Sequence, residues 1–130
     1  MKKKVGDKIS MVTSGWSFDH INKKFDKHIL RSVPFYEEFH RISLKLSEFF
    51  IGEKTSILDI GCSTGTLLND FSSKYPKKNY KIEFIGIDPV SSMIKAAKKK
   101  NKDKRVKFIT KSLLDTNFKN FDFITSVLTI

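Results

Sequence analysis

The apolar positions of the chain follow two different periods, and the change from one to the other lies near residue 53. Upstream of it, apolar residues recur every three or four positions, which is the spacing of one face of an α-helix. A first helix is predicted from Ser17, with an apolar face of Phe18, Ile21, Phe25, Ile29 and Leu30. A second is predicted with Pro34 in its first turn, where a missing N–H costs nothing, and it ends before Gly52. The apolar face of this second helix comprises Phe35, Phe39, Ile42, Leu44, Leu46 and Phe49.

Downstream of residue 53, short apolar runs alternate with helical patterns. Strands are predicted over residues 56–60, 81–87, 106–110 and 121–130, and helices over 64–75 and 91–100. Strands that alternate with helices form parallel sheets with right-handed crossovers. The chain is therefore predicted to have three parts, a flexible basic arm (1–16), a helical cap (17–52) and an α/β domain (53–130).

The composition excludes several classes of protein. A chain of 130 residues, of which 39% are hydrophobic and 12% aromatic, is sufficient for one domain with a core. No apolar run approaches the roughly 18 residues that span a bilayer, and a single Cys cannot form an intramolecular disulfide. The lysines at positions 2–4 are not followed by an apolar stretch, so a signal peptide is not indicated and the cytoplasm is the expected location.

The formal net charge of +11 favours anionic partners such as RNA. The cations are densest in one cluster that contains Lys95, Lys98, Lys99, Lys100, Lys102, Lys104 and Arg105. Two interpretations of this basic cluster remain open. It is either a solvated helix end, where cations suit the helix dipole, or a rim that binds RNA phosphates.

The stretch from Ser56 to Leu68 carries the clearest chemical signal, because a strand runs into a glycine-bearing turn and then into a helix. Gly61 permits the tight turn, and Gly65 removes a side chain where helix, strand and ligand approach one another. The next predicted strand leads into Asp88, where a carboxylate can accept hydrogen bonds from both ribose hydroxyls. The expected ligand is therefore a nucleoside. The turn lacks the G-x-G-x-x-G pattern of dinucleotide sites, which favours an adenosyl ligand.

The run Asp59-Ile60-Gly61-Cys62-Ser63-Thr64-Gly65, followed by Gly86-Ile87-Asp88, resembles motif I and the ribose-binding acid of class I S-adenosylmethionine-dependent methyltransferases. The resemblance implies an α/β, Rossmann-like parallel sheet in the order 3-2-1-4, incomplete at the C-terminus, with two N-terminal helices packed over the cofactor end. It implies S-adenosyl-L-methionine as the cofactor, with Asp59 supporting its ammonium group and Asp88 holding its ribose. Ser63 stands where most members have glycine.

A narrower resemblance lies upstream. Phe25-Asp26 and Arg31-Ser32-Val33-Pro34-Phe35-Tyr36, together with Gly61-Cys62-Ser63, are similar to carboxy-S-adenosylmethionine synthases. That family uses prephenate to convert the methyl group of the cofactor into a carboxymethyl group, which a partner enzyme transfers to a wobble uridine of tRNA. The cofactor-binding residues that both resemblances imply are Tyr36, Asp59, Gly61, Cys62, Ser63, Gly65, Asp88 and Pro89.

The chain matches only the first half of the synthase family, and it departs from the family pattern at three places. Ser112 stands where an acid is expected, although Asp115 follows one helical turn later. Ser126 or Val127 replaces an expected Asn, and a later Arg of the family has no position in this sequence. For these reasons, no catalytic residue is assigned.

The leading hypothesis is an S-adenosylmethionine-dependent transferase, with a small-molecule acceptor or tRNA as its partner. The alternatives are a catalytically silent cofactor-binding module, or half-enzyme, that needs a partner chain, and an NAD-dependent oxidoreductase, which the loop pattern disfavours. Cys62 is interpreted as a small buried group, and His20, His28 and His40 fit no metal-ligand spacing. The last strand is expected to leave an apolar edge, so the expectation is that the chain is truncated, completed by another polypeptide or paired with a second copy along this edge.

Overall fold

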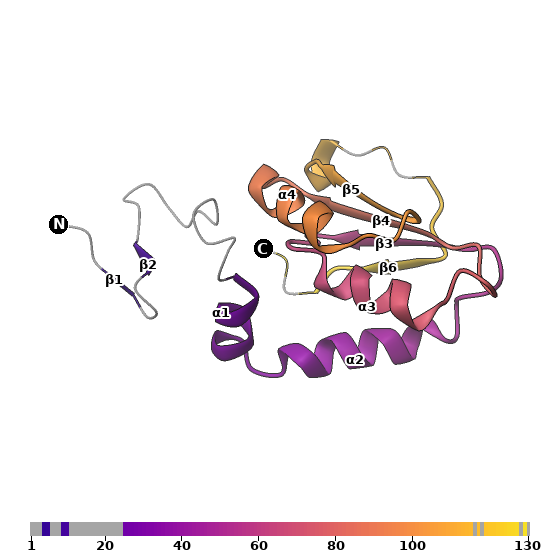
Figure 1. Ribbon diagram of the computed structural model, residues 1–130, viewed down its shortest axis with the longest axis horizontal. Helices are drawn as coiled ribbons and strands as arrows, with labels where there is room; N and C mark the ends of the chain where they lie inside the picture. The colour runs from indigo at the N-terminus through magenta and orange to yellow at the C-terminus, as the bar shows by residue number, and fades with distance from the viewer. Residues whose placement is uncertain are drawn as a thin grey trace.

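A four-stranded parallel sheet forms the centre of the computed structural model, which describes residues 4–5, 9–10, 25–115, 117, 119–127 and 129. Its strands are β3 (Ser56–Ile60), β4 (Glu83–Asp88), β5 (Val106–Thr110) and β6 (Phe123–Thr125), paired in the order β5-β4-β3-β6 (Figure 1). Counted along the chain, this order is 3-2-1-4. The predicted fold class is therefore confirmed.

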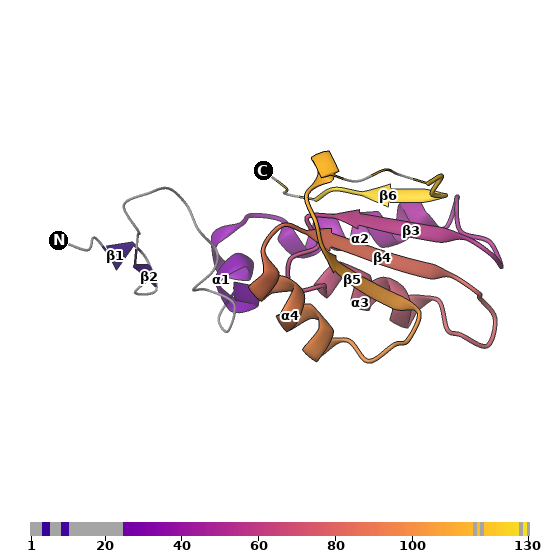
Figure 2. The ribbon, with the colours of Figure 1, turned by 90° about the horizontal axis from the view of Figure 1, so that it is seen from above.

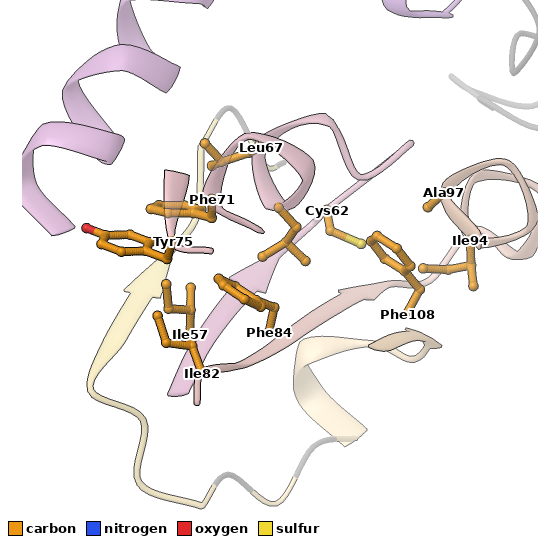
Figure 3. Packing of buried hydrophobic residues seen from close by; sticks show 11 residues of the cluster. Ile57, Cys62, Leu67, Phe71, Tyr75, Ile82, Phe84, Ile94, Ala97 and Phe108 are labelled. Carbon is orange, nitrogen blue, oxygen red and sulfur yellow. The ribbon is translucent and has the colours of Figure 1, made fainter. Parts of the chain in front are cut away.

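The crossover helices α3 (Thr66–Lys74) and α4 (Ser91–Lys100) contribute to one core with the strands. Phe71 of α3 and Phe84 of β4 are fully buried, and Phe108 of β5 lies beside Ala97 of α4 (Figure 3). The buried members of this core are Ile57, Cys62, Leu67, Leu68, Phe71, Tyr75, Ile82, Phe84, Ile94, Ala97 and Phe108. Figure 2 shows the strands with α3 behind them. The core therefore lies between the sheet and its crossover helices.

The N-terminal region is only partly described. The strands β1 (Lys4–Val5) and β2 (Ile9–Ser10) form a short antiparallel pair. The rest of the predicted arm over 1–16, and residues 17–24 of the first predicted helix, lie outside the described residues. From Phe25 onward that helix is present as α1 (Phe25–Ser32), and Phe25 is packed against Met93 of α4.

The predicted start of the second helix was wrong, because α2 (Tyr36–Ser47) begins two residues after Pro34. Phe35 has a φ of 60°, in the left-handed region, and this conformation interrupts the helical path between α1 and α2. Pro34 therefore lies in the turn that joins the helices. This corner directs Tyr36 toward the sheet end described below.

The predicted apolar face of α2 was wrong at five of its six residues, and only Leu44 packs against the core. The side of α2 that packs inward is a stripe of Tyr36, His40, Leu44 and Ser47, of which His40 and Ser47 are buried. The Ser47 hydroxyl and the Tyr75 hydroxyl lie 2.7 Å apart, so the buried polar groups of this stripe have partners. The more apolar stripe is exposed, and it consists of Phe35, Phe39, Ile42, Leu46 and Phe49.

The fourth strand is shorter than the predicted range 121–130, because β6 ends at Thr125. Leu128 and Ile130 lie outside the described residues. Within the described residues β6 pairs with β3 and with no other strand, and Ile124 is 53% exposed. Pairing of this edge with a second copy or another chain stays a prediction. The described part of the chain contains no helix that is long and apolar enough to cross a membrane.

Gly65 allows a test of how tightly the loop after β3 is packed. Its φ is 74°, and a Cβ at this position would lie 2.6 Å from the Phe108 ring. Replacement by alanine should therefore lower the free energy of unfolding by about 2 kcal/mol or more, through backbone strain and overpacking. Denaturant titration measures this loss.

Gly52→Ala is the matched control for Gly65→Ala. A Cβ at Gly52 would meet nothing closer than Thr55 Cγ2 at 3.9 Å, so its effect should stay within about 0.5 kcal/mol. Equal losses in the two variants would contradict the packing described here.

Candidate functional site

The loop after β3 is fixed to the end of β4 by two backbone hydrogen bonds. The N–H groups of Gly61 and Cys62 both donate to the Ile87 carbonyl, at 2.8 and 3.0 Å. Gly61, Ser63 and Gly65 have φ values of 70°, 50° and 74°, so three residues of the loop are left-handed. Glycine adopts this conformation without steric cost, whereas Ser63 adopts it with some strain.

Asp88 joins the loops that follow β3 and β4. Its carboxylate, which is 7% exposed, accepts hydrogen bonds from the Ser63 N–H at 2.9 Å and the Val90 N–H at 2.8 Å. A carboxylate offers about four acceptor positions, so two remain for the hydroxyl groups of a ligand. The acid predicted to bind a ribose is therefore held in place by the backbone, and its role as a ribose ligand stays a prediction.

A pocket opens between the cap helices and the loop after β3. Five of the eight predicted site residues line it, namely Tyr36, Asp59, Gly61, Cys62 and Ser63. Gly65, Asp88 and Pro89 do not line it. Gly65 packs on Phe108, Asp88 holds the loop, and Pro89 is exposed. The other residues that line the pocket are Phe25, Ile29, His40, Thr64, Thr66, Leu67 and Val127.

Asp59 is the buried acid of this pocket. It is 3% exposed, and its Oδ1 accepts a hydrogen bond from the Thr125 hydroxyl at 2.7 Å. Burial raises its pKa to about 7, although the Thr125 bond and nearby His40 act in the opposite direction. A bound cation would stabilise the ionised form, so Asp59 is suited to a positively charged ligand group.

Tyr36 lies beside His40, a residue that the sequence did not single out for this pocket. The ring centroids are 4.4 Å apart, and His40 Nδ1 lies 3.3 Å from Asp70 Oδ2. Burial, with added repulsion from Asp26, Asp59 and Asp70, raises the pKa of Tyr36 to about 12, so its phenol stays protonated. The four-residue spacing of Tyr36 and His40 was the sequence signal that places both side chains on one face of a helix.

A second polar group, also missed from the sequence, attaches α1 to the rest of the site. Asp26 accepts hydrogen bonds from the Thr64 hydroxyl at 2.5 Å and from Lys100 Nζ at 2.8 Å. Lys100 Nζ also donates to the Thr66 hydroxyl at 2.7 Å. Burial opposes ionisation of Asp26, but the bonds from Lys100 and Thr64 keep its pKa below the usual value. These contacts join α1, the loop after β3 and α4.

Two members of the basic cluster have structural partners. Lys100 bonds to Asp26, and Arg105 forms an ion pair with Asp103 at 2.6 Å. The Arg105 guanidinium also donates to the carbonyls of Tyr75 at 2.7 Å and Ser72 at 3.0 Å. The exposed cations that remain in the cluster are Lys95, Lys98, Lys99, Lys102 and Lys104.

Cys62 is a packing residue, in agreement with the sequence interpretation. It is 5% exposed, burial raises the pKa of its thiol, and its sulfur points toward the Phe108 ring (Figure 3). A Cβ at Gly86 would lie 2.8 Å from this sulfur, so glycine is required at that point of β4. A buried thiol with a raised pKa is a poor nucleophile.

The residues at which the sequence departs from the synthase pattern have different places in the structure. Val127 lines the pocket, whereas Ser126 does not. Ser112 precedes the short 3-10 helix η1 (Leu113–Asp115) after β5, Asp115 is the last residue of η1, and neither lines the pocket. His20 lies outside the described residues. Among the described ones, no group of three or more His, Cys, Asp and Glu side chains could hold a metal ion.

The sheet order, the left-handed turn after β3 and the acid at the end of β4 define a Rossmann-like nucleoside-binding domain. Comparison with known proteins narrows this class. A family model for a methyltransferase domain matches residues 57–130. The chain belongs to the class I S-adenosylmethionine-dependent methyltransferase family, whose cofactor is S-adenosyl-L-methionine.

Individual proteins show the same relationship. The chain is 37% identical over 117 residues to a carboxy-S-adenosyl-L-methionine synthase from Staphylococcus epidermidis. The alignment covers 88% of this chain and 50% of that protein. The chain spans about half the length of the curated relatives it matches.

Two solved structures have the same fold. An S-adenosyl-L-methionine-dependent methyltransferase from Methanococcus maripaludis aligns with a TM-score of 0.62 at 19% identity, over 89% of this chain and 53% of that one. The plantazolicin methyltransferase BamL, in complex with SAH, aligns with a TM-score of 0.57 at 26% identity, over 82% of this chain and 41% of that one.

The raised pKa of Asp59 predicts a pH dependence of stability. Because the folded state binds this proton more tightly than the unfolded chain, the contribution of Asp59 to stability falls as the pH rises from about 4 to about 7. Asp59→Asn removes this dependence. Between pH 5 and pH 8, the free energy of unfolding of the variant should rise relative to the parent by on the order of 2 kcal/mol.

Denaturant titrations at the two pH values measure this difference. Asp115→Asn, at an exposed carboxyl group, is the control, and its difference from the parent should be nearly the same at both pH values. A pH-independent difference for Asp59→Asn would contradict a raised pKa.

Proposed function

We propose that this chain binds S-adenosyl-L-methionine in the pocket between the cap helices and the loop after β3, and that it serves a group-transfer reaction. The observation that carries the proposal is that Tyr36, Asp59 and the Gly61–Ser63 turn line one pocket, although they come from separate parts of the chain. The backbone-anchored Asp88 carboxylate lies at the adjoining strand end. The likeness to BamL, which was solved with SAH, supports the same ligand class.

The described residues suit the different parts of this cofactor. Asp59, buried with a pKa of about 7, would bind the ammonium group of the amino-acid end. Asp88 has free acceptor positions for the ribose hydroxyls. When bound, the cofactor supplies a carbon group already activated by its attachment to a sulfonium. The task of the chain is then to orient that group toward an acceptor and to exclude water.

A finer proposal concerns the reaction. The N-terminal run from Arg31 to Tyr36 and the similarity to carboxy-S-adenosyl-L-methionine synthases support a synthase-like activity, linked to wobble-uridine modification of tRNA. The main alternative is a silent cofactor-binding module or a half-enzyme that needs a partner chain. It is supported by Ser112, which stands where the synthase pattern has an acid.

Calorimetric titration tests the binding proposal. S-adenosyl-L-methionine and S-adenosyl-L-homocysteine should bind, and Asp59→Asn should weaken both by about tenfold, because a charge-assisted hydrogen bond to the ammonium is removed. NAD should not bind, since the loop lacks the dinucleotide pattern. Binding of NAD without either adenosyl ligand would refute the proposal and favour the oxidoreductase alternative.

Product analysis separates an enzyme from a silent module. The chain is incubated with S-adenosyl-L-methionine and prephenate, and the cofactor is analysed by mass spectrometry. A carboxymethyl sulfonium product supports the synthase-like activity. Binding without any new product, together with unmodified tRNA in a strain that lacks the gene, supports the silent module.

The exposed lysines of the basic cluster lead to a prediction about tRNA. Replacement of Lys98, Lys99 and Lys102 by Gln should weaken tRNA binding at low salt about tenfold or more. It should also reduce the slope of log K against log salt by roughly one for each phosphate that the variant no longer neutralises. Lys100 is left unchanged because it holds α1. Filter binding over a series of salt concentrations measures both quantities.

A second triple variant controls for net charge. Lys54, Lys78 and Lys81 are exposed and lie outside the basic cluster, and their replacement by Gln removes the same charge. If both triple variants weaken binding equally, the effect belongs to overall charge, and the cluster is only a solvated helix end.

A further inference from the structure

One carboxylate and one imidazole belong to the described residues that line the pocket. Among the described residues that line it, Asp59 is the one carboxylic acid and His40 is the one basic side chain. Lys100, the nearest lysine in the site, is bonded to Asp26 and Thr66 and does not line the pocket. A zwitterionic ligand would therefore meet one negative and one potentially positive side chain.

The contacts of His40 fix both its orientation and its hydrogen. His40 is 8% exposed, its ring packs on Tyr36, and its Nδ1 lies 3.3 Å from Asp70 Oδ2. Because a carboxylate only accepts, Nδ1 carries a hydrogen. Nε2, the second ring nitrogen, forms no hydrogen bond within the part of the chain that the structure describes. When the ring is cationic, Nε2 carries a hydrogen that can be donated to a ligand.

Other donors near the pocket are largely engaged. The N–H groups of Gly61 and Cys62 bond to the Ile87 carbonyl, and that of Ser63 bonds to Asp88. A ligand carboxylate could not use these three groups without breaking the anchor of the loop. The competing donors are the hydroxyl of Tyr36, which lines the pocket, and the first N–H groups of α3, at Thr66 and Leu67, which have no partner within the helix.

We infer that His40, with Nδ1 held by Asp70 and Nε2 left for a ligand, binds the carboxylate at the amino-acid end of S-adenosyl-L-methionine, while Asp59 binds the ammonium. This inference rests on the proposed function, because it assigns a residue to one group of that ligand. His40 and Asp59 would then bind the carboxylate and the ammonium of the ligand at different points of the pocket. His40 is therefore a binding residue that selects adenosyl ligands with an intact amino-acid end.

Three ligands separate the contribution of the ligand carboxylate to the affinity from that of the ammonium. S-adenosyl-L-methionine has both charged groups, its decarboxylated form has only the ammonium, and 5′-methylthioadenosine has neither. Calorimetry compares the affinity of each ligand for the parent and for His40→Gln, which keeps a polar side chain but cannot become charged. The variant should bind S-adenosyl-L-methionine about tenfold or more weakly and the other two ligands within about twofold of the parent.

Two further variants secure the interpretation. Asp70→Asn changes a partly exposed residue. It should weaken the binding of S-adenosyl-L-methionine by about threefold and leave the binding of the other two ligands unchanged, because His40 loses its carboxylate partner. Arg41→Gln removes an exposed cation next to His40 and should leave all three affinities unchanged. Thermal unfolding confirms that each variant is folded. If His40→Gln does not fold, the affinities of Asp70→Asn test the inference in its place.

Each other outcome overturns the inference. Equal weakening of all three ligands would make His40 a support of the pocket wall. Weakening of both ammonium-bearing ligands alone would assign His40 to the ammonium. No weakening would assign the carboxylate to the Tyr36 hydroxyl or to the N–H groups of α3. If the parent binds none of the ligands, the proposed function itself fails, and this result is distinct from the other three.

Discussion

The attachment of the loop after β3 to the end of β4 is the constraint on which the site depends. The Ile87 carbonyl receives two N–H groups, and the Asp88 carboxylate receives a third, so three consecutive residues of the loop are fixed by the neighbouring strand. Because adjacent parallel strands end at the same edge, this anchoring needs no long side chains. The result is a left-handed turn that begins at Gly61 and places Gly61, Cys62 and Ser63 along the pocket. The burial of Asp88 follows from the same arrangement, since its carboxylate replaces water as the acceptor for backbone groups.

The cap helices contribute through polar contacts more than through apolar area. The inward stripe of α2 contains His40 and Ser47, which bond to Asp70 and Tyr75 of the α3 region, and α1 is held by Asp26. Buried polar groups of this kind are stable only when each has a partner, and the structure supplies one for each of these three residues. Partners with defined geometry fix the rotation of α2 about its axis more strictly than a smooth apolar face would. This rotation is what directs Tyr36 and His40 into the pocket.

The sequence was sufficient for the parts of the fold that depend on local pattern. The alternation of strands and helices after residue 53 and the glycine turn at Gly61 come from neighbouring residues, and the order β5-β4-β3-β6 followed from the family resemblance. The face of α2 could not be predicted in the same way. Hydrophobicity favoured the stripe that contains Phe35 and Phe49, whereas the observed rotation depends on hydrogen bonds to α3, about thirty residues away in the chain. The roles of Lys100 and Arg105 were hidden for the same reason, because their partners Asp26 and Tyr75 are distant in sequence.

The distribution of acids explains why an occupied pocket should differ energetically from an empty one. Asp59 is buried against a hydroxyl from Thr125 and has no cation bonded to it among the described residues, so its ionisation is costly without a ligand. Asp26, by contrast, is already bonded to Lys100, and its charge is compensated within the fold. The chain therefore stabilises the charge of the acid that attaches the cap, whereas the acid that lines the pocket is bonded, within the described part of the chain, only to a hydroxyl. A ligand ammonium would remove the cost at Asp59, so part of the binding free energy would come from relief of an electrostatic penalty that folding alone does not relieve.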